Sequence, residues 1–419
     1  MAQIQNYSSS QDLSNGFKEN WADALKQLLG QYNVSASLCG KEANAALSAN
    51  TGDSYNYLTV SEQAAGDIDP YVEQTAVDAT ITVDQMVLNL TSEYTFRQEE
   101  DEKGLAQTYE SFFARQSEAA LKAHNKDIDG NFFAVAFQNT SYVYDAEDLT
   151  GGAAGAAITV TSSNIDEISF NSQALISEQA QEGGNISIVL PPRGIAALGT
   201  SAYGNGSNVS DSAYRGGLTS QLNNGRVGSF FGVDYYQSLF LPHFYELTYT
   251  GQPADTQTVV VKGVTITFVA SLTGGNNEVL IGADEDATYT NLVALLNNSS
   301  GSTATYKGSA INSANQKVLR TLAGKLNTTD GIVDIISKTG RFATAPTETA
   351  NNATIGATQL AQALVTLYGA VELADPRGVR FSQGKNDFGT TMNYSSRVRY
   401  GVATPTNNKQ RYGTIRITA

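Results

Sequence analysis

Few residues of this 419-residue chain could do chemistry. His124 and His243 lie far apart in the sequence, without a nearby cysteine or an H-E-x-x-H spacing, so no zinc site is predicted. The single cysteine, Cys39, has no histidine placed to activate it, and no serine stands in a G-x-S-x-G sequence. We therefore predict that the protein is not an enzyme and has no catalytic, metal-binding or cofactor-binding residue. Each histidine is interpreted as a surface residue or as a hydrogen-bonded core residue.

The stretch NKDIDGN, residues 125–131, resembles the first half of a calcium-binding loop. Oxygen-bearing side chains stand at its positions 1, 3 and 5 and a glycine at position 6. The twelfth position is Ala136, where a bidentate glutamate is needed. A turn that ends a helix is the favoured interpretation.

Two other patterns also have plainer explanations. The stretch GGAAGAA, residues 151–157, lacks the Lys-Ser/Thr of a phosphate-binding loop and is interpreted as a flexible joint. The acidic run RQEEDEKG, residues 97–104, precedes a predicted helix, and acids in that position match the helix dipole.

Composition narrows the class of protein. The formal net charge of −15 opposes sequence-specific nucleic-acid binding unless basic residues gather on one face. No run approaches the roughly 20 apolar residues of a membrane span, the polar start is unlike a secretory signal, and one cysteine fits a reducing compartment. We expect an ordered globular protein with no membrane association.

The first hundred residues contain two predicted elements, a helix and a β-hairpin, that would pack on another surface. Residues 17–29 have helical apolar spacing and would form an arm with one apolar face, packed on its own core or on a neighbouring subunit. Residues 51–96 contain two strand patterns separated by the turn signal GDIDP. An isolated two-stranded hairpin is marginal in water, so this excursion is expected to lie on another surface.

The remaining elements alternate helices and strands. Helices are predicted at 105–124, 165–181, 287–298 and 357–376, a buried strand at 185–190, and a closing antiparallel pair of strands within 395–417. Residues 250–350 include a hairpin that turns at Lys262-Gly263, and they read as a small domain inserted between two halves of a larger one.

The stretch GRVGSFFGVDYYQSLFLP, residues 225–242, carries a family resemblance. Its pattern of glycines, apolar residues, serine and Leu-Pro, preceded by GDSYNYLTV, ALKAHNKDIDGNFF and ISIVLPP in this order, resembles the major capsid proteins of tailed double-stranded DNA bacteriophages. The closing YGVATPTNNKQRYGTIRI resembles that family's last strands. The resemblance covers most of the chain outside about 250–350 and marks a fold rather than a catalytic site.

The resemblance implies an α+β fold of the tailed-phage and herpesvirus capsid type, with seven segments. These are an N-terminal arm (1–50), an extended β-hairpin or E-loop (51–95), a peripheral domain with a long spine helix (96–150), an axial domain with a central sheet (151–249 and 351–390), a small β-rich insertion domain (250–350), and closing strands of the peripheral domain (391–419). The axial motif residues are Gly228, Gly232, Val233, Tyr235 and Pro242, and the candidates for inter-subunit contact are Phe17, Trp21, Leu25, Tyr55, Tyr57, Tyr71, Val83 and Met86.

The function implied is that of a shell subunit. Copies of the chain would assemble as hexamers and pentamers into an icosahedral head, in the host cytoplasm, and enclose genomic DNA without sequence-specific binding. A portal protein, and scaffolding and decoration proteins, would be further partners of the virion. The alternatives are another phage or surface subunit, such as a tail-tube, head-fibre, decoration or surface-layer protein, and remotely a glycan-active enzyme, for which no pair of acids stands out.

Overall fold

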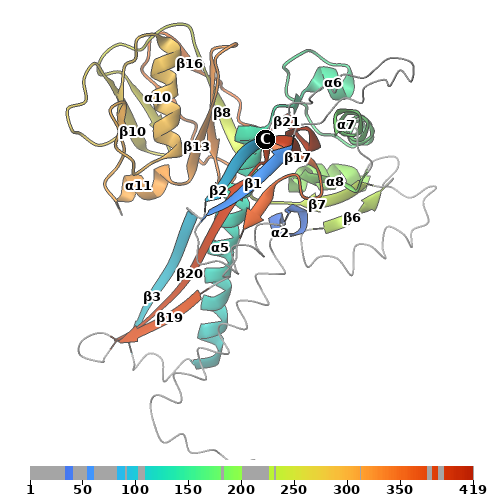
Figure 1. The fold of residues 1–419 in the computed structure, drawn as a ribbon, viewed down its shortest axis with the longest axis horizontal. Coiled ribbons are helices and arrows are strands. Elements are labelled where there is room, and N and C mark those ends of the chain that lie inside the picture. Colours follow the sequence, from blue (N-terminus) through green and yellow to red (C-terminus); the bar gives the residue numbers. More distant parts are fainter. Residues whose placement is uncertain are drawn as a thin grey trace, which may run out of the picture.

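The computed structural model confirms the α+β class. It describes residues 34–40, 54–60, 83–89, 92–101, 109–180, 184–200, 226–230, 233–311, 313–374, 380–385 and 391–418. Within these residues a long helix, a large mixed sheet and a lobe with a second sheet make up the body of the molecule (Figure 1). None of the helices described is both long and apolar enough to cross a bilayer.

Helix α5, Tyr109–Asn139, is the longest element of the body. At 1.5 Å per residue its 31 residues span about 46 Å. Strand β20 (Thr391–Ala403) lies along it and pairs antiparallel with β3 (Ser92–Asp101) on one side and β19 (Arg380–Lys385) on the other. β18 (Glu372–Ala374) pairs with the end of β20.

The prediction of a helix-ending turn at 125–131 is wrong, because α5 runs through these residues. Asn, Asp and Gly disfavour helix interiors. Here the apolar residues among them, Ile128, Phe132 and Phe133, are buried in one core with β20, and this packing outweighs the local preference. Gly130 is required by a close approach, since a Cβ at this position would lie 2.2 Å from the carbonyl oxygen of Lys338.

A ten-stranded mixed sheet forms the centre of the body. Its main path is β13-β14-β8-β17-β5-β7-β6, and β16, β21 and β4 pair off this path. The strands are β4 (Val143–Tyr144), β5 (Ile186–Leu190), β6 (Arg226–Phe230), β7 (Val233–Gln237), β8 (His243–Tyr249), β13 (Leu322–Asn327), β14 (Ile332–Ser337), β16 (Ala353–Ile355), β17 (Leu360–Leu367) and β21 (Tyr412–Thr418).

Apolar layers cover both faces of this sheet. Helices α7 (Ile165–Ala180) and α8 (Pro192–Thr200) pack on one face, where Ile188 and Val365 are buried. On the other face Val189 and Leu364 join the core of α5 and β20. The short helix α6 (Ala146–Thr150) follows α5 and β4 and contacts α7.

The helix predicted at 357–376 is wrong, since this segment forms strands β17 and β18. All eight residues of β17 are buried, because the strand lies between β5, β8 and β21 with both faces of the sheet covered. A strand buried on both faces shows no alternation, and LAQALVTL contains good helix formers, so periodicity favours the wrong element.

The predicted closing pair of strands is also wrong. β20 and β21 are both strands, but β20 pairs with β3, β18 and β19, whereas β21 pairs with β17 and β4. The 3-10 helix η2 (Thr406–Arg411) separates them and redirects the chain into the large sheet. Strand composition predicted both elements correctly but carried no information about their partners.

Residues 250–350 form a lobe (Figure 1), and its core also includes Tyr245, Leu247 and Tyr249 of β8. Its five-stranded sheet has the order β12-β11-β10-β9-β15, made of β9 (Thr258–Val261), β10 (Val264–Val269), β11 (Glu278–Leu280), β12 (Tyr306–Lys307) and β15 (Thr347–Glu348). Helix α10 (Glu285–Asn297) packs on this sheet and on β13, and α11 (Ala314–Leu319) leads into β13. Because β14 pairs with both β13 and β8, two strands of the lobe belong to the large sheet.

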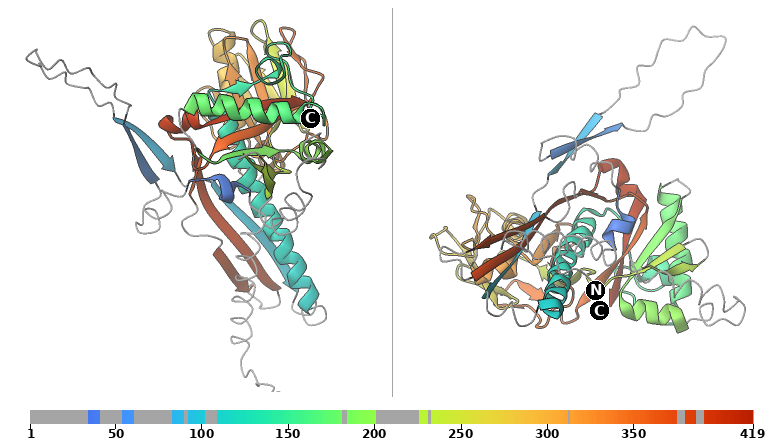
Figure 2. Two further views of the ribbon diagram at one scale, coloured as in Figure 1. Left: turned by 90° about the vertical axis from the view of Figure 1, so that its right-hand side faces the viewer. Right: turned by 90° about the horizontal axis from the view of Figure 1, so that it is seen from below.

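Two pieces from the N-terminal region complete the described structure. Helix α2 (Ser35–Leu38) is buried beside α5, and Gly40 forms a parallel bridge with Glu372. Strands β1 (Ser54–Val60) and β2 (Val83–Asn89) form an antiparallel hairpin that pairs with no other described strand. The hairpin projects from the body in both views of Figure 2.

Candidate functional site

The predicted contact residues divide between the hairpin and the undescribed segments. Phe17, Trp21, Leu25, Tyr71 and Gly232 lie outside the described residues. Tyr55 and Tyr57 lie in β1, and Val83 and Met86 lie in β2. The backbone register pairs Tyr57 with Met86 and Val60 with Val83.

The axial motif is a structural element of the large sheet. Val233 and Tyr235 are buried in the core beneath α7, and β7 pairs in parallel with β5 and antiparallel with β6. Gly228 lies at a register irregularity in β6, where a residue without a side chain suits the bulge. Pro242 is buried, and its carbonyl oxygen accepts a hydrogen bond from the Gln362 amide at 3.0 Å. These contacts hold β17 to the end of the motif.

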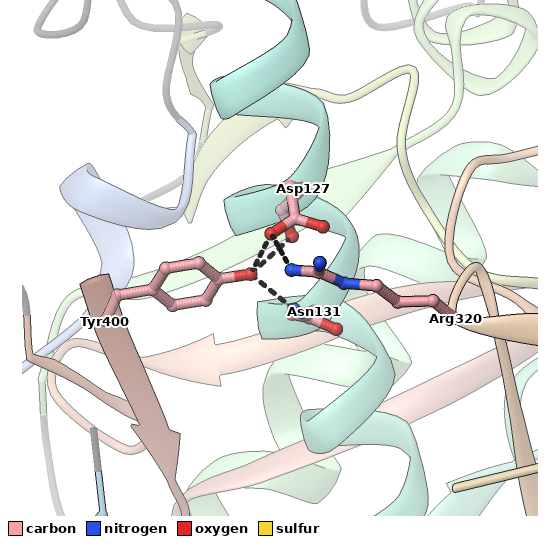
Figure 3. Close-up of polar contacts among 4 residues, drawn as sticks. All are labelled: Asp127, Asn131, Arg320 and Tyr400. Atoms are coloured by element: carbon pink, nitrogen blue, oxygen red, sulfur yellow. Dashed lines mark hydrogen bonds and ion pairs between the residues drawn. The ribbon is translucent and has the colours of Figure 1, made fainter. Parts of the chain in front are cut away.

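Polar residues among 125–131 of α5 contact β20, the lobe and the N-terminal segment, and Figure 3 shows the first two of these contacts. The Tyr400 hydroxyl, from β20, donates at 2.7 Å to Oδ2 of Asp127 and lies 3.0 Å from the backbone carbonyl oxygen of the same residue. Asn131, one turn further along α5, donates from Nδ2 to the same hydroxyl. Burial and the Asp127 charge hold the pKa of Tyr400 well above its usual value, so the hydroxyl stays a donor.

The lobe reaches the same carboxylate through Arg320. Its Nη2 lies 4.0 Å from Oδ2 of Asp127. Lys338, after β14, lies beside this pair: burial lowers its pKa to about 8, while the Asp127 charge opposes that shift. The backbone of Lys338 packs against Gly130 of α5. The lobe is therefore held to the long helix by both charge and close packing.

Asp129, a second carboxylate among residues 125–131, binds the N-terminal segment 34–40. Asp129 is buried and accepts hydrogen bonds from the backbone amides of Ser35 at 3.1 Å and Val34 at 3.3 Å. Burial raises the pKa of Asp129 to about 6, and the hydrogen bonds from Ser35 and Val34 oppose that rise. Asp129 therefore anchors residues 34–40 against α5.

The C-terminal end of α5 is also tied to the lobe. Lys325 of β13 donates from Nζ to the carbonyl oxygens of Phe137 at 3.1 Å and Thr140 at 3.3 Å, where the helix dipole favours a cation. Gln138 donates to Oδ1 of Asn297 at 2.7 Å and to the Gly324 carbonyl oxygen at 3.0 Å. Asp334, opposite Lys325 in the strand register, has its pKa raised to about 7 by burial.

His124 is a buried core residue with a hydrogen bond, as one of the two predicted interpretations had it, whereas His243 is half-buried. His124 is fully buried on α5, and its Nε2 lies 2.7 Å from Oγ of Ser396 on β20. Burial lowers the pKa of His124 to about 4, so the ring is neutral at physiological pH. Nδ1 of His243 lies 3.0 Å from the Leu241 carbonyl oxygen. Cys39 is buried beside α5.

The site joins α5 to β20, to the lobe and to the N-terminal segment through polar side-chain contacts. Among the residues that the structure describes, no group of three His, Cys, Asp or Glu side chains could hold a metal ion. Sequence analysis compared 125–131 with a calcium-binding loop, favoured a helix-ending turn, and did not predict its contacts with other elements. The apolar residues interleaved with the polar ones, at helical spacing, were the signal for a helix interior.

No protein-family model and no curated protein matches the sequence. Solved structures align along most of the chain. One is labelled Mycobacterium phage Che8, with a TM-score of 0.48, 10% identity, and coverage of 91% of this chain and 89% of that one. Another is the acidic stable capsid of the Helicobacter pylori bacteriophage KHP30, with a TM-score of 0.41, 9% identity and coverage of 100% of both chains.

A third solved structure is a virus-like particle from Pyrococcus furiosus. Its chain aligns with a TM-score of 0.39 and 6% identity, over 96% of this chain and 98% of that one. All three TM-scores lie below 0.5 and all three identities below 25%, so these likenesses by themselves assign no activity or partner to the chain.

Proposed function

We propose that this chain is the major capsid subunit of a tailed bacteriophage, and that its copies assemble as hexamers and pentamers into an icosahedral head. The observation that carries the proposal is the β1–β2 hairpin. It pairs with no other described strand and projects from the body of the molecule. In that body the lobe, β20 and the N-terminal segment all contact α5. A hairpin of two strands is marginal alone in water, so a surface of a neighbouring copy is the natural partner.

The rest of the subunit supports this role because it is built as one unit around α5. The lobe, β20 and the N-terminal segment each reach α5 through a polar contact, made by Arg320, Tyr400 and the Val34–Ser35 amides respectively. A body that keeps its shape can present the same surfaces in every copy. Repetition of one modest contact around a closed shell then gives a stable assembly.

The overall charge suits an envelope for DNA. With a formal net charge of −15, the subunit does not attract a polyphosphate along its whole surface. The enclosed double-stranded DNA would be contained without sequence-specific binding. A portal protein, scaffolding and decoration proteins as partners, assembly in the host cytoplasm, and residence in the virion are parts of this proposal. A shell subunit of this kind needs no catalytic residue or cofactor.

Removing the hairpin tests the proposal. Residues 53–91 would be replaced by a short Gly-Ser linker, which leaves β3 in place to pair with β20. We expect a folded, soluble subunit with an unchanged thermal unfolding midpoint, and no shells by sedimentation or electron microscopy, in contrast to the full chain. Normal shells from the deletion would show that the hairpin is not the element that joins copies.

A further inference from the structure

Four charged side chains lie in a row across the large sheet, beside the C-terminal end of α5. Lys325 of β13 is directly opposite Asp334 of β14, and Asp334 is directly opposite Glu246 of β8. Residues in these positions point to the same face of a sheet. Arg416 of β21 forms an ion pair with Glu246 and completes the row. We name these four residues the charge row, and along it the charges run plus, minus, minus, plus.

Two aromatic rings cover part of the charge row. Nζ of Lys325 lies 5.1 Å from the centre of the Phe137 ring, and Cζ of Arg416 lies 5.9 Å from the centre of the Phe244 ring. The two ring centres are 5.3 Å apart, and both rings belong to one apolar cluster. All four residues of the charge row are half-buried. Charges that have lost part of their water interact more strongly with one another than charges on an open surface do.

Lys325 binds the end of α5 and leaves its neighbour in the charge row without a bond. Its Nζ donates to the carbonyl oxygens of Phe137 at 3.1 Å and Thr140 at 3.3 Å. No ion pair joins Lys325 to Asp334 in the described part of the chain, although Cβ atoms of directly opposite residues are about 4.5–5.5 Å apart. The Asp334 carboxylate accepts no hydrogen bond from the described residues, and the Lys325 charge acts on it from nearby. Lys325 therefore has a second partner within the reach of its side chain.

Asp334 lies between a cation and another carboxylate. Glu246, on its other side, is paired with Arg416, and Arg416 in turn feels the charge of Asp145 at the start of α6. Like charges in directly opposite positions destabilise a sheet, so ionisation of Asp334 beside Glu246 is costly. Burial raises the pKa of Asp334 to about 7, and the Lys325 charge opposes that rise. Asp334 therefore gains and loses its proton near neutral pH.

The two protonation states of Asp334 favour different positions of Lys325. When Asp334 is neutral, the last carbonyl oxygens of α5 are the better partners, because the dipole of a helix favours a cation at its C-terminal end. When Asp334 is ionised, its carboxylate attracts the same ammonium group across the strand pair. One side chain can thus move between the lobe and the long helix without any change in the strands.

We propose that Asp334 makes the contact between the lobe and α5 depend on pH. With a proton on Asp334, Lys325 binds the C-terminal carbonyl oxygens of α5; without it, Lys325 pairs with Asp334 and leaves them. Gln138 still joins the helix end to the lobe, so the contact loosens and does not separate. Tight attachment and proton binding favour each other by linkage. The inference concerns one subunit and does not rest on the proposed function.

Hydrogen exchange of the full-length chain, followed by mass spectrometry between pH 6 and pH 8.5, tests this inference. Peptides that cover residues 135–141 and 322–327 report on opening of the contact. Each rate is divided by the rate of an unstructured chain at the same pH. We expect the corrected rate of wild type to rise about fivefold across this range, the factor expected for the loss of one typical hydrogen bond. The midpoint should lie near pH 7.

Three variants of the charge row distinguish this mechanism from a purely structural role. Asp334→Asn is neutral at every pH, so its corrected exchange should stay at the slow rate that wild type has at pH 6. Lys325→Met keeps most of the side chain but lacks the ammonium group, and it should exchange at the fast rate throughout. Glu246→Gln should move the midpoint to lower pH, because a like charge has been removed from beside Asp334.

Asp330→Asn is the matched control, because Asp330 is an exposed acid in the turn of the same β13–β14 hairpin. It should keep the pH profile of wild type. A corrected wild-type rate that does not change between pH 6 and pH 8.5 would overturn the inference, and so would a pH dependence that persists in Asp334→Asn. Loss of the pH dependence in Asp330→Asn would overturn it as well, since the effect would then follow from the overall charge of the hairpin.

Discussion

The lobe of residues 250–350 and the β1–β2 hairpin are both β-rich excursions from the body, yet they are stabilised in different ways. The lobe buries residues of two sheets and of α10 in one core, and Lys325 and Gln138 join it to α5. The hairpin pairs only with itself among the described strands. The lobe, with its covering helix, shares a core with β8, whereas the proposed function assigns the hairpin to a contact with a neighbouring copy.

A substitution in the lobe core should have the largest effect on the free energy of unfolding of the subunit. Tyr289 is fully buried, stacks on Tyr249 with ring centroids 4.2 Å apart, and meets the edge of Phe268 at 5.9 Å. Tyr289→Ala is expected to lower the free energy of unfolding by about 3–5 kcal/mol, measured by chemical denaturation.

Tyr289→Phe is the matched control for this prediction. The Tyr289 hydroxyl is buried without a hydrogen-bond partner among the described residues, so the phenylalanine variant should be as stable as wild type or slightly more stable. A loss below about 1 kcal/mol for Tyr289→Ala would mean that the lobe is not packed as one core with β8.

Acidification should lower the free energy of unfolding of the subunit through His124. Its folded pKa of about 4 lies below the ordinary 6.5, so the unfolded state binds more protons between these values. The stability that His124 contributes is present above pH 6.5 and is lost as the pH falls toward 4, by up to about 3 kcal/mol.

The raised pKa values of Asp129 and Asp334 act in the opposite direction, because the folded state binds their protons first. The readout is therefore the difference between wild type and His124→Gln, followed by denaturation at pH 7, 5.5 and 4.5. The variant should lose less stability on acidification than wild type does. Parallel pH profiles would contradict a neutral, buried His124.

The close approach of α5 to the lobe predicts a smaller effect. Gly130→Ala gains up to about 1 kcal/mol of helix propensity. However, the new Cβ would lie 2.2 Å from the Lys338 carbonyl oxygen, so the contact must open, and a net loss of about 1–3 kcal/mol is expected. Asn139→Ala, at an exposed position of the same helix, should change stability by less than about 0.5 kcal/mol. Equal unfolding midpoints for the two variants would argue against the contact.

The smallest effect on the isolated subunit should come from the hairpin. Tyr57→Ala, opposite Met86 in the register, is expected to change the free energy of unfolding by less than about 0.5 kcal/mol. Shell formation by the same variant should fall, because the proposed function places the hairpin in contacts between copies. A large loss of subunit stability together with normal assembly would show that the hairpin stabilises its own subunit, as the lobe core does, and does not join copies.

Local signals in the sequence predicted local structure well. The hairpin turn at Lys262-Gly263 has the positive φ angles, 49° and 80°, that such a turn needs, and α7 and α10 follow their apolar spacing. Strand β17 was mistaken for a helix because burial on both faces removes the alternation that marks a strand.

Strand pairs and side-chain contacts between residues far apart in the sequence could not be predicted from local patterns. Alternation identified β20 and β21 as strands, but their separate sheets depend on β3 and β17, which lie elsewhere in the chain. The roles of Asp127 and Asp129 likewise depend on Tyr400 and on the Val34–Ser35 amides. The proposed shell function rests on the resemblance of motifs in order, and the structure adds the contacts that join the lobe, β20 and the N-terminal segment to α5.

Electron microscopy of the purified full-length chain, fractionated by sedimentation, tests the central claim most directly. The account predicts closed shells or rings of five and six copies, with the hairpin of each copy lying on its neighbour. A monodisperse monomer, tubes or flat lattices across the range of protein and salt concentrations would contradict it.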